Sequence, residues 1–134
     1  MLGTVRYTVP AMTDRVQEFG AEWNAQVRKG LLELCVLGLI ARGPRYGYDI
    51  VQDLAAAAPL AAAEGTVYPL LRRLKQSGWV ETYWQESEAG PPRQYYRVTA
   101  AGRRALQQMR RGWRALVDAV DSYVGSEVSH ARAQ

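Results

Sequence analysis

The most constraining feature of this sequence is residues 27–41, where apolar side chains occupy nearly every face of a predicted helix. A helix that is apolar all round must be buried on every side, so we expect it at the centre of the domain. Its longest apolar run, residues 31–41, is about half the length that spans a bilayer, and Glu33 interrupts it, so no membrane is expected as a partner. Gly43 and Pro44 then end this helix.

Amphipathic helices are predicted on both sides of the central helix. Residues 13–27 repeat apolar side chains at three- and four-residue steps, whereas residues 1–12 show no period and are expected to form a loose arm. Residues 46–57 and 64–77 predict two more helices, each with one apolar face. The apolar positions of these helices are Val16, Phe19, Trp23, Val27, Ile50, Val51, Leu54, Val67, Leu70, Leu71 and Leu74. Gly78 suits the left-handed backbone that ends a helix.

The period changes after Gly78. Residues 79–85 and 93–98 are rich in aromatic and β-favouring residues, and a loop with glycine and proline separates them, so they predict two antiparallel strands. Thr99 can act as the N-cap of a last helix over residues 100–124, and residues 125–134 are expected to fray. The predicted fold class is therefore mainly α with a small β-hairpin: a winged helix-turn-helix followed by a long C-terminal helix.

Reactive side chains are scarce. The single cysteine, Cys35, and the single histidine, His130, can supply neither a disulfide framework nor a four-ligand zinc site. No carboxylate pair stands beside either residue, and no glycine-rich phosphate loop is present, so we expect no enzyme, no metal and no cofactor. No export signal opens the chain, so a cytoplasmic protein is expected.

The positive charge is concentrated in the middle of the chain. The net charge is +4, but residues 65–114 alone carry ten basic and three acidic side chains. A basic middle between nearly neutral ends predicts one positive face, with double-stranded DNA as its partner. A solvated surface with a local excess of arginine is the alternative that charge alone leaves open.

The helix predicted over residues 64–77 has the layout of a DNA-recognition helix. One face would hold it to the domain, and the other would fit a major groove, where arginine pairs with guanine and arginine or lysine neutralises phosphate. The polar face carries Gly65, Thr66, Pro69, Arg72, Arg73 and Gln76, with Tyr68 and Lys75 at its flanks. An ordinary amphipathic surface helix is the alternative, although Pro69 disturbs one backbone hydrogen bond without an evident packing reason.

The predicted hairpin places cations beside aromatic residues. Alternation turns Tyr96 to one face of the hairpin and Tyr95 to the other, and one of these tyrosines is expected to cover the core. Such a strand suits a wing that lies along a phosphate backbone. Because Glu86 and Glu88 at the tip repel phosphate, DNA contact is expected to centre on Arg93.

The last predicted helix, within residues 99–124, carries an apolar stripe like a coiled-coil seam. The stripe comprises Leu106, Met109, Trp113, Leu116, Val120 and Tyr123. Because this helix extends past the compact unit, we expect the stripe to form a homodimer interface, which Val16, Phe19 and Trp23 complete. Packing of the stripe within one chain, most simply against residues 13–27, is the alternative, and both can hold together.

Four motifs in one order resemble the PadR family of bacterial transcriptional regulators. They are RKGLLEL at residues 28–34, GPRYGY at 43–48, EGTVYPLLRRL at 64–74 and GPPRQYYRVT at 90–99. The resemblance covers about residues 23–124. It implies a homodimeric repressor whose winged helix-turn-helix, here residues 28–98, binds a palindromic operator in the nucleoid.

The resemblance also implies roles for particular residues. In the family the Gly-Thr-x-Tyr-Pro segment opens the recognition helix, so Gly65, Thr66, Tyr68 and Pro69 are assigned to DNA. The same reasoning adds Tyr46 and Tyr48 at the start of the preceding helix, Arg93 in the wing, and Arg28 and Lys29. Some multidrug-sensing members stack flat aromatic compounds on a tryptophan that matches Trp113, which implies a small aromatic effector. An effector-sensing or protein-interaction module with weak DNA binding is therefore the alternative function.

One position departs from the family pattern. Members often carry serine before the Glu/Gln-Gly-Thr segment, and this chain has Ala63 there. The loss of that hydroxyl removes about 1 kcal/mol of helix capping. The neighbouring Glu64 repels phosphate unless it points away or accepts from a cytosine amino group.

Overall fold

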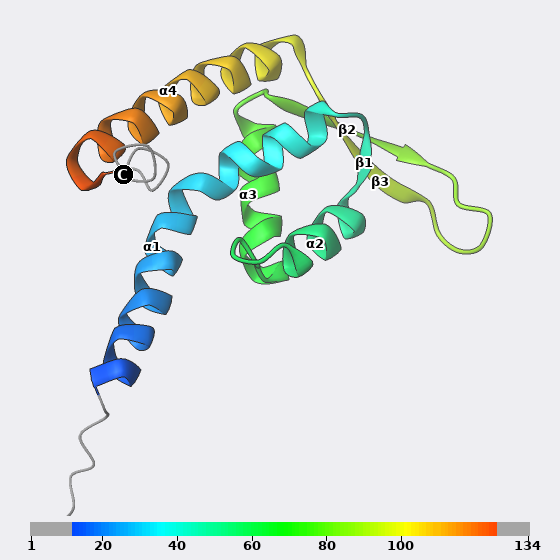
Figure 1. Cartoon of the computed structure of the whole chain (residues 1–134). Coiled ribbons are helices and arrows are strands. Elements are labelled where there is room, and N and C mark those ends of the chain that lie inside the picture. Colours follow the sequence, from blue (N-terminus) through cyan, green and yellow to red (C-terminus); the bar gives the residue numbers. More distant parts are fainter. Residues whose placement is uncertain (1–11, 126–134) are drawn as a thin grey trace, which may run out of the picture.

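The structure is a computed structural model that describes residues 12–125 (Figure 1). Its helices are α1 (Met12–Ala41), α2 (Gly47–Ala56), α3 (Glu64–Gln76) and α4 (Ala100–Val124), and its strands are β1 (Arg45–Tyr46), β2 (Val80–Gln85) and β3 (Arg93–Val98). The loose arm expected over residues 1–12 and the frayed tail expected beyond Gly125 lie outside the described residues. No helix of the described part is long and apolar enough to cross a membrane.

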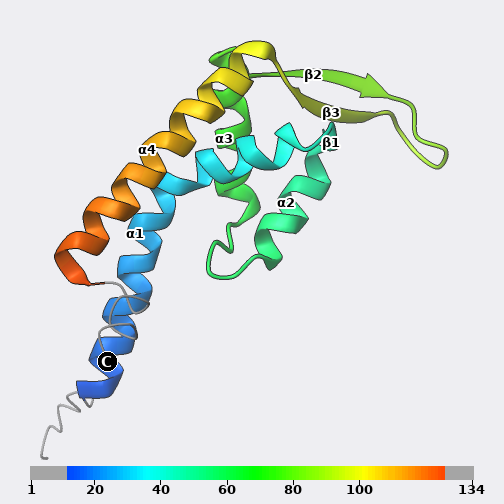
Figure 2. The same ribbon diagram turned by 45° about the horizontal axis from the view of Figure 1, so that its top comes forward.

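The first helix is one continuous element of 30 residues. The prediction of two helices that meet at Val27 is therefore wrong. Gly30 lowers helix propensity but keeps its backbone N–H, so it does not end the helix. The change of apolar pattern at Val27 marks a change of surroundings instead, from an exposed N-terminal part to a buried C-terminal part. The ribbon of α1 bends between these two parts (Figures 1 and 2).

A single core joins the C-terminal part of α1 to α2, α3 and the sheet. As predicted, the central apolar helix and the apolar faces of the next two helices supply most of it. That helix is not buried on every side, however, because Leu34, Cys35 and Leu39 are half-buried and line a hollow between α1, α2 and α4. The buried apolar residues are Leu32, Val36, Leu37, Ile40, Ile50, Val51, Leu54, Ala62, Val67, Leu70, Leu71, Leu74, Val80 and Tyr96. The core therefore lies within one chain and supports α3 from its inner side.

The sheet contains one strand more than the predicted hairpin. The hairpin β2–β3 is confirmed, and the short strand β1 pairs with β3 in the order β1-β3-β2. In this register Arg45 lies opposite Tyr96, and Tyr46 lies opposite Tyr95. Tyr46 therefore belongs to a strand rather than to the predicted helix 46–57, because two residues pair with β3 before α2 begins. A two-residue strand is too short to give a periodic signal.

Thr99 connects the sheet to α4, as its N-cap prediction requires. Its hydroxyl accepts a hydrogen bond from the amide of Gly102 (2.9 Å) and donates one to the carbonyl of Gly78 (2.7 Å). Gly78 adopts φ +78°, which confirms the left-handed end predicted for α3. At Gly102 a Cβ would collide with the carbonyl oxygen of Trp79, so glycine permits the close approach of α4 to the sheet.

Candidate nucleic-acid interface

The two faces of α3 are divided as the sequence predicts. Val67, Leu70, Leu71 and Leu74 are buried, whereas Glu64, Gly65, Thr66, Arg72, Arg73, Lys75 and Gln76 are exposed. Ala63 occupies the N-cap and offers no side-chain hydrogen bond. Glu64 lies in the first turn, where a carboxylate interacts favourably with the positive end of the helix dipole. The helix therefore presents a polar face to its surroundings, interrupted by half-buried Pro69.

Tyr68 and Tyr96 meet at the start of α2, over Gly47. A Cβ added to Gly47 would lie 3.1 Å from the ring of Tyr96 and 3.8 Å from that of Tyr68, so a small residue lets both rings approach the helix backbone. Burial raises the pKa of Tyr96, and burial together with the charge of Glu64 raises the pKa of Tyr68. Tyrosine hydroxyls keep their protons at neutral pH even without these shifts, so both can donate hydrogen bonds to an anion such as phosphate.

The other face of the sheet carries a row of aromatic and cationic contacts. Tyr83 and Tyr95 stack at 5.6 Å, and Tyr95 lies 5.9 Å from Tyr46 between ring centroids. The guanidinium of Arg93 lies 4.8 Å from the ring centroid of Tyr46. Arg97 makes the same contact with Tyr83 and also pairs with Glu81 at 2.7 Å. Cation–π contact thus positions Arg93, while the charge of Arg97 is already compensated.

A hollow of about 220 Å³ brings together residues from the start of α2, from α3 and from the hairpin. Its lining comprises Tyr46, Gly47, Tyr48, Tyr68, Trp84, Pro92, Arg93, Gln94 and Tyr96. Four of the predicted DNA-binding residues, Tyr46, Tyr48, Tyr68 and Arg93, therefore meet in one place although they come from three separate segments of the sequence. The recognition helix and the wing form one continuous surface here.

Trp84 is the main residue of this surface that the sequence analysis missed. It lies on β2 opposite Gln94, and 66% of its surface is exposed. Alternation places it on the same side of the strand as buried Val80, so its exposure marks the point where the sheet leaves the core. The signal available in the sequence was a large aromatic residue near the end of the first predicted strand of the hairpin, residues 79–85.

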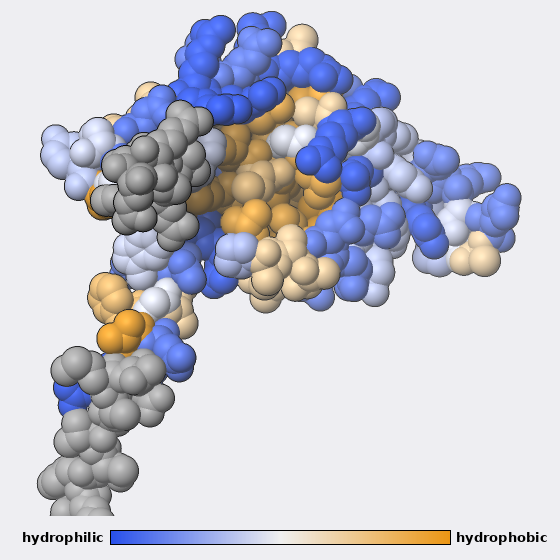
Figure 3. Space-filling model, in the orientation of Figure 1, coloured by the Kyte–Doolittle hydropathy of each residue, from blue (hydrophilic) through white to orange (hydrophobic). Residues whose placement is uncertain are grey.

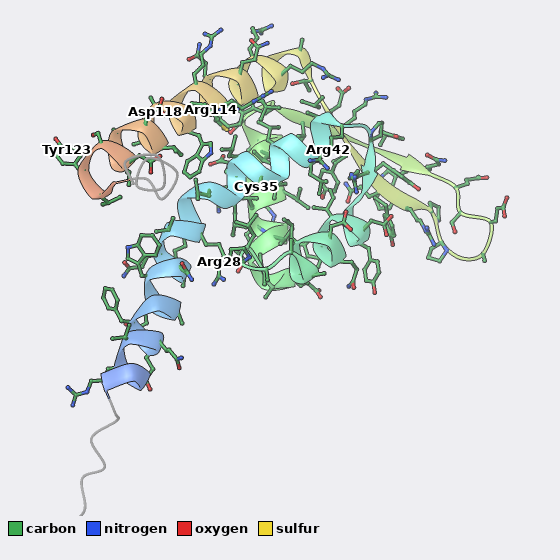
Figure 4. All side chains as sticks on the ribbon, in the orientation of Figure 1. Arg28, Cys35, Arg42, Arg114, Asp118 and Tyr123 are labelled. Carbon is green, nitrogen blue, oxygen red and sulfur yellow. The ribbon has the colours of Figure 1, made fainter. Side chains whose placement is uncertain are left out.

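Arg28 and Lys29 lie apart from this hollow, on α1. Arg28 donates a hydrogen bond to the carbonyl of Pro59 (3.3 Å), in the loop that joins α2 to α3. Figure 4 shows Arg28 beside this loop and away from the hairpin. The remaining predicted contacts lie on α3: Arg72, Arg73 and Lys75 are exposed, whereas Pro69, inside the helix, is half-buried.

The predicted dimer residues divide into two groups. Leu106 and Met109 pack against the core of their own chain, with Leu106 beside Gly38 of α1, and not against residues 13–27 as the intramolecular alternative expects. The others are exposed: Val16, Phe19, Trp23, Trp113, Leu116, Val120 and Tyr123. Between α1, α2 and α4 lies a largely apolar hollow of about 720 Å³, and Figure 3 shows apolar surface gathered there. A smaller hollow of about 230 Å³ between α1 and α4 is lined by Trp113, with Glu33 on the facing helix.

These features define a winged helix-turn-helix protein with an exposed recognition helix and a small three-stranded sheet. Residues 36–108 match the transcriptional regulator PadR-like family, and the chain belongs to this family. The predicted resemblance and the predicted fold class are therefore confirmed. The family consists of DNA-binding transcriptional regulators rather than enzymes.

Solved structures of PadR-type proteins resemble this chain over most of its length. A PadR-like transcription factor from Bacteroides fragilis is 40% identical, with 77% of this chain and 99% of that chain covered and a TM-score of 0.63. A PadR family regulator from Eggerthella lenta is 32% identical, covers 87% and 100% of the two chains and has a TM-score of 0.74. A PadR-like regulator from Bacillus cereus is 31% identical over 76% and 99%, with a TM-score of 0.68.

Proposed function

We propose that this PadR-family regulator is a repressor that binds a palindromic operator as a homodimer in the cytoplasm, at the nucleoid. In this proposal residues 28–98 form the DNA-binding unit, residues 99–124 form the main dimer helix, and residues 13–27 complete the dimer interface. Each chain reads one half-site, because a two-fold dimer matches a two-fold DNA sequence.

The observation that carries the proposal is the hollow where α2, α3 and the hairpin meet. Tyr48, Tyr68 and Arg93 stand together there, beside the exposed polar face of α3. We assign Arg72 and Arg73 to base edges in the major groove and Arg93 to the backbone beside it. In the first turn of α3, Gly65 approaches phosphate with its backbone amide and Thr66 with its hydroxyl, since the amide of Thr66 already donates to the carbonyl of Ala63 (2.9 Å).

The dimer is supported by apolar side chains that one chain leaves uncovered. On α1 these are Val16, Phe19 and Trp23, and on the second half of α4 they are Leu116, Val120 and Tyr123. A continuous apolar surface of this kind marks an interaction site. Both α1 and α4 contribute to this apolar surface. In one two-fold interface, α1 of each chain can therefore pack against α4 of the other chain.

The test begins with selection of binding sequences from a random duplex library by the full-length protein. We expect an inverted repeat, and the variant Arg72→Ala should bind the selected duplex at least 100-fold more weakly while its circular dichroism stays unchanged. Arg42→Ala, which removes an exposed arginine from the end of α1, is the matched control and should bind like the wild type. Wild-type affinity of Arg72→Ala would refute the assignment of the recognition helix.

A second candidate function, sensing of a small aromatic effector, rests on the hollow beside Trp113. Met109 and Leu116 line its apolar part, and Glu33 supplies a carboxylate that favours a cationic compound. A flat cationic dye such as ethidium should quench tryptophan fluorescence in the wild type and much less in Trp113→Ala. Equal quenching in the two proteins would rule out this site, and Trp84→Ala provides the matched control.

A further inference from the structure

The outer side of α4 carries five arginines that the proposed operator contact does not use: Arg103, Arg104, Arg110, Arg111 and Arg114. All five are exposed, and no acidic residue stands between the first and the last of them. At about 100° per residue they share one side of the helix: Arg104 and Arg111 lie roughly opposite the apolar stripe, whereas Arg103 and Arg110 flank it and line the hollow between α1, α2 and α4. We call this surface the arginine face.

The charge of the arginine face is not compensated by the ion pairs of the described residues. Those pairs join Arg45 to Asp53 and Arg97 to Glu81, both outside α4. Gln107, Arg110, Arg111 and Arg114 line a depression of about 430 Å³ that has no apolar side chain in its lining. The next acidic residue along α4 is Asp118, one turn after the last arginine.

The arginine face lies apart from the proposed operator contact. In both ribbon views α4 lies on the opposite side of α1 from α2, whose first residues line the hollow with Tyr68 and Arg93 (Figures 1 and 2). Arg114 is on the part of α4 farther from the hairpin (Figure 4). A duplex held by α3 and the hairpin is therefore not the natural partner of these arginines.

The residue composition of the arginine face indicates which kind of anionic partner it can bind. A membrane surface needs apolar side chains beside the cations, and a protein interface needs an apolar or aromatic centre, but the depression lined by Gln107, Arg110, Arg111 and Arg114 has neither. Arginine, rather than lysine, favours bidentate contact with phosphate oxygens. The five arginines span about 16 Å of helix, over which one DNA strand presents about five phosphates.

We propose that the arginine face of α4 binds the phosphodiester backbone of a second DNA duplex, without reading its sequence, while α3 holds the first. A dimer would then join two DNA segments. Because the dimer proposed above uses the apolar side of α4, the arginines point outward in it. This inference concerns a different surface from the proposed operator contact. It would hold even if α3 and the hairpin bound the first duplex without sequence specificity.

The test is a two-duplex capture experiment with the full-length protein. A biotinylated 30-base-pair duplex, selected from the random library, is saturated with protein, and capture of a fluorescent 30-base-pair duplex of unrelated sequence is measured. The variant carrying Arg110→Gln, Arg111→Gln and Arg114→Gln should capture the second duplex at least tenfold more weakly and bind the first within twofold of wild type. Its capture should also depend less on salt, with the slope of log affinity against log salt reduced by about 2 to 3.

Two matched variants separate this inference from the proposed function. The triple lysine variant at the same three positions keeps the charge and should retain capture within about threefold. Arg72→Ala should lose the preference for the selected duplex and bind both duplexes equally weakly, through α4. Capture by the triple glutamine variant at wild-type strength would overturn the inference. So would a wild-type protein that captures phosphatidylglycerol vesicles or polyglutamate but no second duplex.

Discussion

The same kinds of residue have opposite surroundings in two regions of this molecule. In the winged unit, apolar residues such as Leu37 and Ile40 of α1 are completely buried. In the arms, by which we mean residues 15–27 of α1 and 113–124 of α4, Phe19 is 66% and Tyr123 91% exposed. Since α1 contributes to both regions, one continuous helix is buried in the core at its C-terminal part and exposes apolar side chains at its N-terminal part.

This difference separates two sources of stability. The winged unit is stabilised by burial within one chain, so its free energy of unfolding should depend little on protein concentration. The apolar surface of the arms gains stability only when a second surface covers it, and that contribution must follow mass action. Substitutions in the two regions should therefore have different signatures, and the predictions below test this from the largest expected effect to the smallest.

The largest effect is expected for Leu37→Ala in the core. Leu37 has no exposed surface, so its truncation removes buried contacts and leaves a cavity that costs about 2–5 kcal/mol. Urea unfolding should show this loss at every protein concentration. Leu116→Ala is the matched control, because this side chain is 61% exposed and should change stability by less than about 0.5 kcal/mol in dilute protein. Equal losses for both variants would contradict the division into two regions.

A charge in the arms should act on assembly instead of folding. Leu116→Glu combined with Val120→Glu places two carboxylates on the exposed apolar stripe of α4. We expect the dissociation constant of the proposed dimer to rise at least 100-fold, which corresponds to about 2.7 kcal/mol, with unchanged helix content. Sedimentation velocity across a concentration series measures this. Gln107→Glu with Gln108→Glu, two exposed positions outside the stripe, is the control.

The sequence predicted the winged unit well because its periodic signals are long. The buried face of α3 and the two longer strands each repeat over several residues, and burial follows that repeat. The strand β1 was missed because Arg45 and Tyr46 acquire their role only by pairing with β3, which lies some fifty residues further along the chain. The break predicted at Val27 is a change in burial along one continuous helix. A periodic apolar pattern shows where burial changes, but it does not show whether the helix ends there.

The candidate site could be predicted residue by residue but not as a surface. Motifs named Tyr48, Tyr68 and Arg93, yet only the fold brings them into one hollow. Trp84 was missed because an aromatic residue in a strand is usually assigned to a core, and its exposure depends on where the hairpin leaves the domain. The seam of α4 also combined Leu106, which packs on its own core, with residues further along that remain exposed.

The junction between the two regions should be sensitive to a single methyl group. Gly102 lies where α4 passes the carbonyl of Trp79, and an alanine there would force the helix and the strand apart. We expect Gly102→Ala to lower the free energy of unfolding by about 1–3 kcal/mol, measured by urea titration. Gly65→Ala is the same substitution in a helix with open space around it, so it should be neutral or slightly stabilising. A neutral Gly102→Ala would mean that α4 is docked more loosely than the structure describes.

The smallest effect concerns the N-caps of α3 and α4, which differ by one hydroxyl group. Ala63 and Thr99 both have extended backbone (φ −78°, ψ 158° and φ −92°, ψ 170°), but only Thr99 caps its helix with a side chain. Thr99→Ala should therefore destabilise the protein by about 1 kcal/mol, whereas Ala63→Ser should stabilise it by up to about the same amount. Thermal unfolding of both variants and of Thr99→Ser, which keeps the hydroxyl, measures the difference. If Ala63→Ser gave no gain, the amide of Gly65 would already be satisfied, and its assignment to phosphate would lose its basis.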